Sequence, residues 1–453
     1  MKVSHTVQAR LASSVFRSAK FGVTASILLT VTMGLPVQSR ASIILGGTGS
    51  QTDVQKAVIA AKPGDTVQLP AGVFVFTSTV SVTNGVSLQG AGIDSTIIVD
   101  EVPRNQQHAQ VFIFASVTNQ NVRFSGLTIR GGTTNTSVNY NGCLAVYGTT
   151  RSFRVDHVKF SKPYALGIYA DGHLYGVIDH CFFDLIGNEG IQVYHNNWNE
   201  KDFGDGSWAD SLYWGTEKAI YIEDNVFQNG NYNPAVDAYG GSRWVFRYNT
   251  VTNDYIGNHG TDSSQRYRSS RYCEVYNNTF YWPPTADNTP WPFAVYMRGG
   301  TGVIFSNSFL GKFTSMMALA NYRSTTNPDG YPWKPWGPAI GGTNAWDGNT
   351  DINGYPCLDQ VGRGTGDLLS GSPATPVAWP HQISDPVYQW GNTLNGVPAT
   401  SGAQQVVIQL NRDWFDGVPR PGYKPFVYPH PLVSGSDLNR PTPPSNLRVV
   451  SGP

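Results

Sequence analysis

Apolar and polar positions alternate, and then end in glycine, four times in the middle of the chain. The four segments read LAVYG, IYADG, VDAYG and VYMRG, at residues 144–148, 168–172, 236–240 and 295–299. Alternation with a period of two is typical of a β-strand, and a closing glycine is typical of a turn. The pattern therefore predicts one short strand that recurs along the chain.

A second sequence feature recurs after these segments. It is a His or Asn that precedes an apolar or aromatic residue. Its positions are separated by steps of 23, 45, 24, 29 and 29 residues and comprise His157, His180, Asn225, Asn249, Asn278 and Asn307. A period of 20 to 30 residues built from strands and turns is typical of a solenoid, and the long step predicts an enlarged coil. We expect these six side chains to form a polar ladder, inward or at the turns, bonded from coil to coil.

The rest of the chain divides around this repeat. Residues 52–62 have helical apolar spacing and end before Pro63-Gly64, so we expect a short helix that caps the open end of the core. We predict an all-β solenoid at 42–312 and a loop-rich extension at 313–438, rich in Pro, Trp and Gly, that packs on the solenoid. Residues 439–453 are predicted to be a Pro-rich linker.

The first 41 residues have the features of an export signal. Four basic residues precede an apolar stretch at 21–37, and Ser39-Arg40-Ala41 offers a small-residue cleavage site. A single membrane anchor is the alternative, although threonines and Gly34-Leu35-Pro36 interrupt the stretch. We expect a secreted protein, extracellular or periplasmic, with no membrane segment after the signal is removed.

Charge and cysteine content argue against several classes of partner and of metal or redox site. The 31 basic and 31 acidic residues cancel, which argues against nucleic acid as a partner. The four cysteines contain no CxxC pair, so neither a zinc knot nor a redox motif is predicted. Export would permit disulfides, but Cys143 and Cys181 lie in strand-like apolar contexts typical of buried free thiols; the state of Cys273 and Cys357 stays open.

The opening of the repeat resembles a known family. Residues 54–67, 69–74 and 86–92 look like the first coils of right-handed parallel β-helix proteins of the pectate-lyase-like superfamily, and the resemblance covers about residues 45–312. It implies an all-β, right-handed parallel β-helix. Members of that superfamily include polysaccharide lyases, glycoside hydrolases, epimerases and phage tailspikes, so the resemblance does not assign a reaction.

Stacking the glycine-ended strands predicts which side chains share a face. One outward column would contain Tyr169, Asp237 and Tyr296, and a second would contain Tyr147, Asp171, Tyr239 and Arg298. The segment at 190–195 fits the same frame and adds Gln192 and Tyr194. His259 joins the second column if its register holds, because a slip of one residue would turn it inward.

These columns predict a sugar-processing cleft, in which rings stack on sugars and carboxylates do acid–base work. The candidate catalytic residues are Asp237, Asp262, His259, Arg298 and Tyr239. The candidate substrate-binding residues are Asp171, Tyr194, His195, Tyr169, Trp198, Trp214 and Tyr296, with the two tryptophans in an aromatic insertion at 196–217. Structural alternatives are a turn cap for Asp237 and a turn position for His259.

Two mechanisms compete on a polysaccharide substrate. In a glycoside hydrolase, Asp237 and Asp262 would form the carboxyl pair. In a polysaccharide lyase, His259 or Tyr239 would take the proton beside a uronate carboxylate that Arg298 neutralises. Zero net charge and the acidic insertion favour hydrolysis. A non-catalytic carbohydrate-binding or adhesive β-helix is the third reading.

We expect no cofactor; loosely spaced acidic residues leave Ca²⁺ as the alternative.

Overall fold

The computed structural model describes residues 41–434 apart from several gaps, the longest of which is 322–357. The described ranges are 41–103, 109–116, 121–133, 142–149, 151–163, 166–184, 189–228, 233–261, 267–283, 293–321, 358–366, 382–404 and 408–434. The chain divides into two units, residues 1–40 and 41–453. The predicted export signal, the Pro-rich linker, Asp262 and Cys357 therefore lie outside the described residues, except for Ala41.

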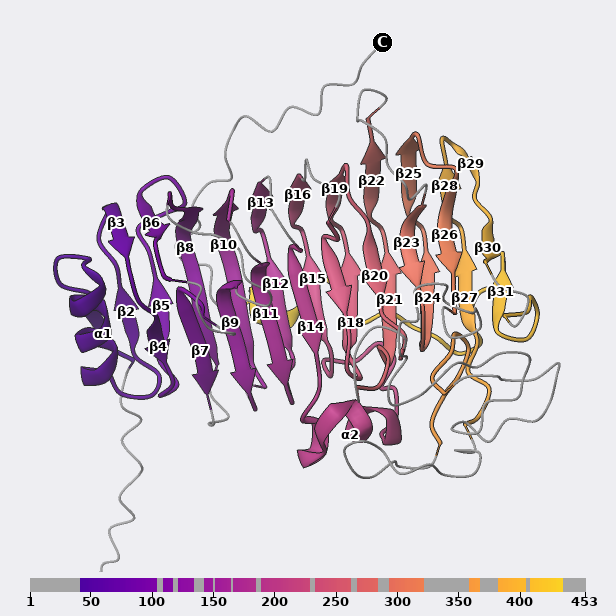
Figure 1. The fold of residues 1–453 in the computed structure, drawn as a ribbon, viewed down its shortest axis with the longest axis horizontal. Helices are drawn as coiled ribbons and strands as arrows, with labels where there is room; N and C mark the ends of the chain where they lie inside the picture. Colours follow the sequence, from indigo (N-terminus) through magenta and orange to yellow (C-terminus); the bar gives the residue numbers. More distant parts are fainter. Residues whose placement is uncertain are drawn as a thin grey trace, which may run out of the picture. The chain divides into compact units, whose positions relative to one another are not determined.

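Within the described residues, the strands form two sheets, of 21 and 10 strands. The ten-stranded sheet is parallel throughout and lies in front in Figure 1. Its strands in sheet order are β4 (Val80–Val82), β7 (Phe112–Ser116), β9 (Gly142–Gly148), β11 (Leu166–Gly172), β14 (Ile191–Tyr194), β17 (Val236–Ala238), β20 (Ile256–Asn258), β23 (Phe293–Met297), β26 (Ser315–Leu319) and β30 (Ser401–Ala403).

The larger sheet consists of two columns, joined by the long strands β8 (Val122–Gly131) and β10 (Phe153–Ser161), which belong to both. The β1 column also contains β1 (Ile43–Leu45), β2 (Thr66–Gln68), β5 (Ser87–Gln89), β12 (Gly176–Asp179), β15 (Ile220–Glu223), β18 (Arg243–Arg247), β21 (Tyr272–Tyr276), β24 (Thr301–Phe305), β27 (Val387–Trp390) and β31 (Trp414–Asp416).

The β3 column completes each coil. It contains β3 (Gly72–Phe76), β6 (Thr96–Asp100), β13 (Phe182–Asp184), β16 (Val226–Gln228), β19 (Thr250–Thr252), β22 (Thr279–Trp282), β25 (Ser308–Gly311) and β28 (Thr393–Leu394), with β29 (Val397–Pro398) in an antiparallel hairpin at its end. Three parallel columns around one apolar interior define a parallel β-helix, as the sequence predicts.

Helix α1 (Gln51–Ala60) covers the first coil, beside β2 and β4 in Figure 1. Its N-cap residue is Ser50, whose side chain accepts from the Asp53 backbone N–H, and its buried residues Val54 and Val58 join the apolar interior. The capping helix predicted at residues 52–62 is confirmed. The other short helical segments are η1 (Trp198–Glu200), η2 (Asp202–Gly204), α2 (Asp205–Ala209) and α3 (Pro431–Ser434).

A buried asparagine ladder runs along the interior corner of the coils. Each asparagine donates from Nδ2 to backbone carbonyls and to the Oδ1 of the next asparagine, through Asn225, Asn249, Asn278, Asn307 and Asn392. The predicted ladder is confirmed at these positions. His157 and His180 lie at left-handed turns and stack on each other across coils, 5.2 Å between ring centroids, which fits the turn-side form of the prediction, although each ring bonds the preceding Asp of its own coil.

Truncating one rung should cost stability without altering the site. Asn278→Ala removes the acceptor of the Asn249 N–H and the donor to the Phe246 carbonyl, so buried backbone groups lose their partners. We expect the free energy of unfolding to fall by about 2 to 4 kcal/mol, measured by denaturant titration. Ser308→Ala, one coil further, is the control, with a change within about 0.5 kcal/mol. Equal effects of the two would contradict a stabilising ladder.

The coils continue further than the sequence pattern indicated. Strand β26 follows residue 312, and β27, β28, β30 and β31 add to the columns after the long segment 322–386. Asn392 accepts from Asn307 and thus extends the ladder across this segment. Part of the region predicted as a loop-rich extension therefore belongs to the β-helix itself.

The segment 423–434 lies on the outer face of the β1 column. It bonds to buried charges there, with the Tyr423 hydroxyl 2.6 Å from Glu274 and the His430 N–H 2.8 Å from Glu223. Arg247 donates to Glu223 and to the Phe426 and Val427 carbonyls. Burial raises the pKa of Glu274 to about 7. This C-terminal segment therefore seals a charged face that would otherwise be open.

Cysteines, membrane segments and metal sites can be checked over the described part of the chain. Cys143, Cys181 and Cys273 are free and buried, as predicted for the first two. None of the described helices has the length and apolarity needed to cross a membrane. Among the described residues, no cluster of three or more His, Cys, Asp or Glu is placed to hold a metal ion.

Candidate functional site

The register of the ten-stranded sheet places the predicted columns as the sequence indicated. Tyr169 pairs with Gln192, Gln192 with Asp237, Asp237 with Gly257, and Gly257 with Tyr296. The same register sets a second column one step along the outer face, through Tyr147, Asp171, Tyr194, Tyr239, His259 and Arg298. Since Asn258 is the inward residue, with no exposed surface, His259 faces outward.

Asp237 is the centre of the site. Its Oδ2 lies 2.8 Å from Nε2 of His259 and accepts a hydrogen bond of 2.7 Å from the Tyr239 hydroxyl. Asp237 is 4% exposed, whereas the His259 side chain retains 17% of its surface. The carboxylate is therefore enclosed and orients two groups that are closer to solvent.

Arg298 lies against the imidazole ring of His259. Its Nη2 contacts both ring nitrogens, at 2.6 Å from Nε2. A guanidinium only donates hydrogen bonds and a carboxylate only accepts them. An imidazole between Arg298 and Asp237 can bond to both when it is neutral, with Nε2–H directed toward Asp237 and a lone pair on Nδ1. This tautomer leaves a basic nitrogen beside a fixed positive charge.

A second carboxyl group, Glu189, contacts Asp237. It precedes β14, is close enough for the Asp237 charge to act on it, and accepts a hydrogen bond from Gln192. Burial, and then the Asp237 charge, raise the pKa of Glu189 well above its usual range. Burial also acts to raise the pKa of Asp237, but its contacts with His259, Arg298 and Tyr239 lower it overall. Glu189 therefore holds a proton beside an ionised Asp237.

An aromatic row extends from this centre across the neighbouring coils. Successive ring centroids are separated by 5.6, 5.3, 4.9 and 3.8 Å through Tyr147, Tyr169, Tyr194, Tyr239 and His259. Burial, and then nearby Asp237, raise the pKa of Tyr239 well above its usual range, so its hydroxyl keeps a proton at neutral pH. The row offers ring edges and hydroxyls along the direction in which the coils stack.

Asp171 and Tyr296 flank this row of site residues. Asp171 accepts from the backbone and side-chain N–H groups of Asn196, at 3.3 and 3.2 Å, and from the Tyr169 hydroxyl at 3.4 Å. Tyr296 is 6% exposed and lies beside Arg298, whose guanidinium carbon is 5.5 Å from its ring centroid. Both lie in the predicted columns, although most of their surface is enclosed.

Three predicted substrate-binding residues lie elsewhere. His195 has no exposed surface; Nε2 donates to the Leu174 carbonyl and Nδ1 accepts from the Arg243 N–H. Burial lowers its pKa to about 3. Trp198 is 1% exposed and packs on His173, and Trp214 packs on Tyr272 beneath the C-terminal segment. His195 and Trp198 therefore fill protein interior rather than an accessible surface, whereas Trp214 is partly buried and its substrate contact stays a prediction.

Two residues near the centre were not identified from the sequence. Glu189 lies just before its strand, where alternation no longer indicates direction, so its position followed only from the fold. Tyr267 packs between Tyr194 and Phe203, at 6.3 and 5.8 Å between centroids. Its segment, Gln265 to Ser270, carries no strand pattern, although its density of Arg and Tyr is a usable signal.

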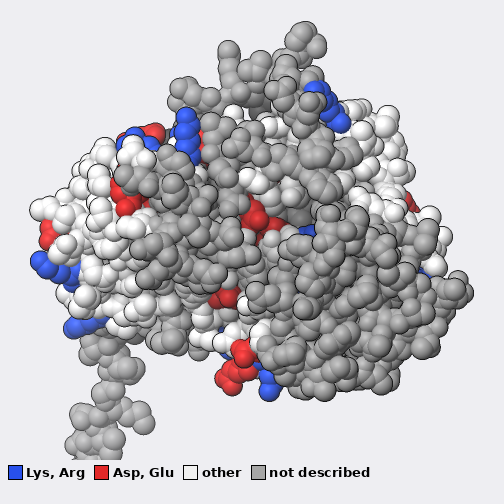
Figure 2. All heavy atoms as spheres, viewed as in Figure 1, with Lys and Arg blue, Asp and Glu red and all other residues white. Residues whose placement is uncertain are grey.

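Charge is sparse around the β-helix. On the face in Figure 2, Lys, Arg, Asp and Glu atoms form small separate groups among uncharged residues. The described part of this face therefore presents no extended field of one sign, which fits the balanced composition.

Comparisons with known proteins give similarity to solved structures alone. No family model matches the chain, and no curated protein matches it. Similar structures include ORF18 of Geobacillus virus E2, at 14% identity and a TM-score of 0.38, covering 61% of this chain and 54% of that one. An alginate lyase from Paenibacillus sp. has 13% identity and a TM-score of 0.25, with coverage of 61% and 93%. The catalytic domain of a GH87 α-1,3-glucanase with nigerose has 12% identity and a TM-score of 0.26, with coverage of 82% and 66%.

The present chain thus spans about half the length of the viral protein. At these identities and TM-scores the similarities do not bear on function. The candidate site has to be interpreted from its own geometry.

Proposed function

We propose that this protein is a secreted enzyme that cleaves a uronate-containing polysaccharide by β-elimination. The observation that carries the proposal is the contact series Asp237–His259–Arg298, in which an enclosed carboxylate orients an imidazole that touches a guanidinium. A base next to a fixed positive charge is what proton removal beside a carboxylate requires.

The residues supply each step of such a reaction. The substrate carboxylate takes the donors of Arg298, which neutralises it and acidifies the adjacent C5–H. Because Arg298 then bonds this carboxylate instead of His259, Nδ1 of His259 is released and accepts that proton, the C4–O bond breaks, and the electron pair forms a C4–C5 double bond. The Tyr239 hydroxyl, which keeps its proton, donates it to the departing glycosidic oxygen. Asp237 holds both groups in place.

A hydrolase is the second candidate, favoured by the protonation pattern of Glu189 and Asp237. A neutral acid beside an ionised carboxylate is a common acid–base pair. Glycosidases, however, separate these groups by about 5 to 5.5 Å or about 6.5 to 9.5 Å to admit sugar or water. Oδ2 of Asp237 is instead occupied by Nε2 of His259 and by the Tyr239 hydroxyl, at 2.8 and 2.7 Å, rather than open to a sugar or a water molecule.

Product chemistry on a polysaccharide panel separates these proposals. We expect ultraviolet absorbance from an unsaturated uronate to rise on at least one polyuronate, together with new reducing ends. Reducing ends without that absorbance would favour the hydrolase. Binding without either product would leave a non-catalytic carbohydrate-binding β-helix. A matched panel of neutral glucans and mannans is the control, and cleavage of these alone would contradict the role given to Arg298.

A further inference from the structure

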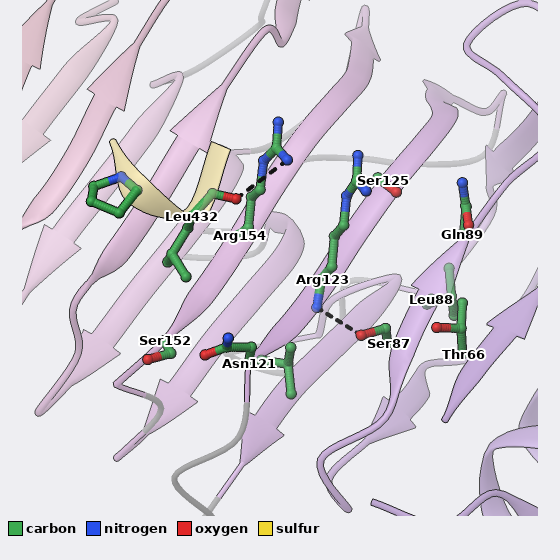
Figure 3. Close-up of a pocket in the computed structure, with 12 residues that line it drawn as sticks. Thr66, Ser87, Leu88, Gln89, Asn121, Arg123, Ser125, Ser152, Arg154 and Leu432 are labelled. Atoms are coloured by element: carbon green, nitrogen blue, oxygen red, sulfur yellow. Dashed lines mark hydrogen bonds between the residues drawn. The ribbon is translucent and has the colours of Figure 1, made fainter. Parts of the chain in front are cut away.

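A pocket of about 340 Å³ lies on the outer face of the β1 column, away from the candidate site. It opens between the first coils and helix α3, which carries Leu432 (Figure 3). Its polar lining includes Thr66, Ser87, Gln89 and Asn121. The volume is at the lower end of the range for small-molecule sites.

A second pocket of about 320 Å³ continues the first across the same coils. The two share Gln89, Arg123 and Ser125 as lining residues. The second extends to Gln68 and to the glycine turn at 90–92. Together they form a groove, which we call the β1 groove, that crosses several coils.

Charges in the β1 groove are paired within the protein. Arg123 bonds Asp156 through Nε and Nη2, both at 2.6 Å, and Arg154 bonds Asp179 at 2.9 and 2.8 Å. Both carboxylates have no exposed surface. Arg154 also reaches the Leu432 carbonyl, as Figure 3 shows. His157 also lines the second pocket and bonds the same Asp156 at 2.7 Å, so each basic group of the groove faces a buried carboxylate and the remaining polar lining consists of hydroxyl and amide groups.

Ser125 provides a second, independent observation. It lines both pockets and is 2% exposed, and its hydroxyl has no hydrogen-bond partner among the described residues. Buried hydroxyls are almost always bonded, so a group from outside the protein is expected there. The register places Ser125 beside Gln89, and Gln89 beside Gln68, so polar groups recur about every 4.8 Å along the groove.

The rest of this face has a different character. From Val177 onward its outward positions combine apolar or aromatic residues, such as Tyr221 and Val245, with buried charges such as Glu223, and the C-terminal segment packs on them. That segment reaches the groove only through α3, whose Pro431 and Leu432 form its apolar wall. The face therefore changes from a surface covered by the C-terminal segment to an open polar groove over the first coils.

We propose that the β1 groove binds a neutral saccharide chain, as a site separate from the candidate catalytic site. Hydroxyl and amide groups repeated at a short interval, next to an apolar wall and without net charge, match the hydroxyls and apolar faces of linked sugars. A charged ligand would find no unpaired partner in the pairs named above. The inference does not depend on the proposed reaction, since it concerns binding alone.

Calorimetric titration of the whole protein with neutral tetrasaccharides tests this proposal. The probes are cellotetraose, laminaritetraose and mannotetraose. We expect at least one to bind, and we expect Thr66→Tyr, which fills the groove from an outward strand position, to weaken that binding by about tenfold or more. Thr252→Tyr is the matched control on strand β19, and should leave the affinity unchanged. Gln89→Ala, which removes one amide without added bulk, should weaken binding severalfold.

Comparison with Arg298→Ala decides where binding occurs. If the tetrasaccharide binds normally to Arg298→Ala and poorly to Thr66→Tyr, the β1 groove is the site. Loss of binding in Arg298→Ala with full binding in Thr66→Tyr would overturn the inference, as would the absence of binding by all three probes to the unaltered protein. Circular dichroism of each variant verifies folding, and Gln89→Ala keeps the test valid if Thr66→Tyr does not fold.

Discussion

Replacement of Asp237 by asparagine is expected to lower turnover by at least about a thousandfold while the protein stays folded. An amide can present its NH₂ group to Nε2 of His259, which would reverse the tautomer and place the proton on Nδ1. The imidazole then has no free base directed at the substrate. The measurement is kcat on the polymer identified by the panel assay, with thermal unfolding recorded in parallel.

Asp184→Asn provides the matched control for this variant. Asp184 lies on β13, on another face, where it accepts a 3.3 Å bond from Ser161 and pairs with Lys159 at 3.9 Å. It should change kcat by less than about twofold. Should Asp237→Asn retain more than about a tenth of normal turnover, the role of Asp237 in the proposed mechanism would be wrong.

The second large effect concerns stability, at Arg247. This side chain has no exposed surface and donates to Glu223, the Tyr276 hydroxyl and two carbonyls of the C-terminal segment. Arg247→Met leaves the buried Glu223 carboxylate without its partner, so the free energy of unfolding should fall by about 3 to 5 kcal/mol. Denaturant titration measures this change, and limited proteolysis reports release of segment 423–434.

Two further variants make the test specific. Arg130→Met removes an exposed arginine from β8 and should have an effect within about 0.5 kcal/mol. Combining Arg247→Met with Glu223→Gln removes both charges, and should recover part of the lost stability because no unpaired ion remains. A double variant as unstable as Arg247→Met alone would show that packing, rather than charge pairing, dominates at this position.

The sequence was sufficient to predict the β-helix and the phase of its strands. The segments that end in glycine repeat one alternation, so aligning them places Asp237, Tyr239, His259 and Arg298 on one face, as the register confirms. The asparagine ladder was visible for the same reason. Both depend on local periodicity, which each coil repeats. The catalytic roles of these residues stay predictions.

Features without periodicity could not be predicted. Glu189 acts from a turn, where no rule sets side-chain direction. His195 extends a strand by one residue, and its burial depends on Leu174 and Arg243 from distant coils. The aromatic insertion suggested sugar contacts for Trp198 and Trp214, but large rings also fill gaps between a loop and a sheet. The final coils could not be recognised from the sequence pattern because segment 322–386 interrupts the repeat.

The path of segment 423–434 has a consequence for the order of folding. Adjacent coils can stack as soon as each is available, because their contacts are close in sequence. In contrast, the hydrogen bond between Arg154 and Leu432 joins residues 278 positions apart in the sequence. Arg247 bonds carbonyls that are 179 and 180 positions further along the chain. Closing such long loops is slow. During synthesis, the charged side chains on the outer face of the β1 column must therefore remain uncovered on the early coils until the C-terminal segment has been made.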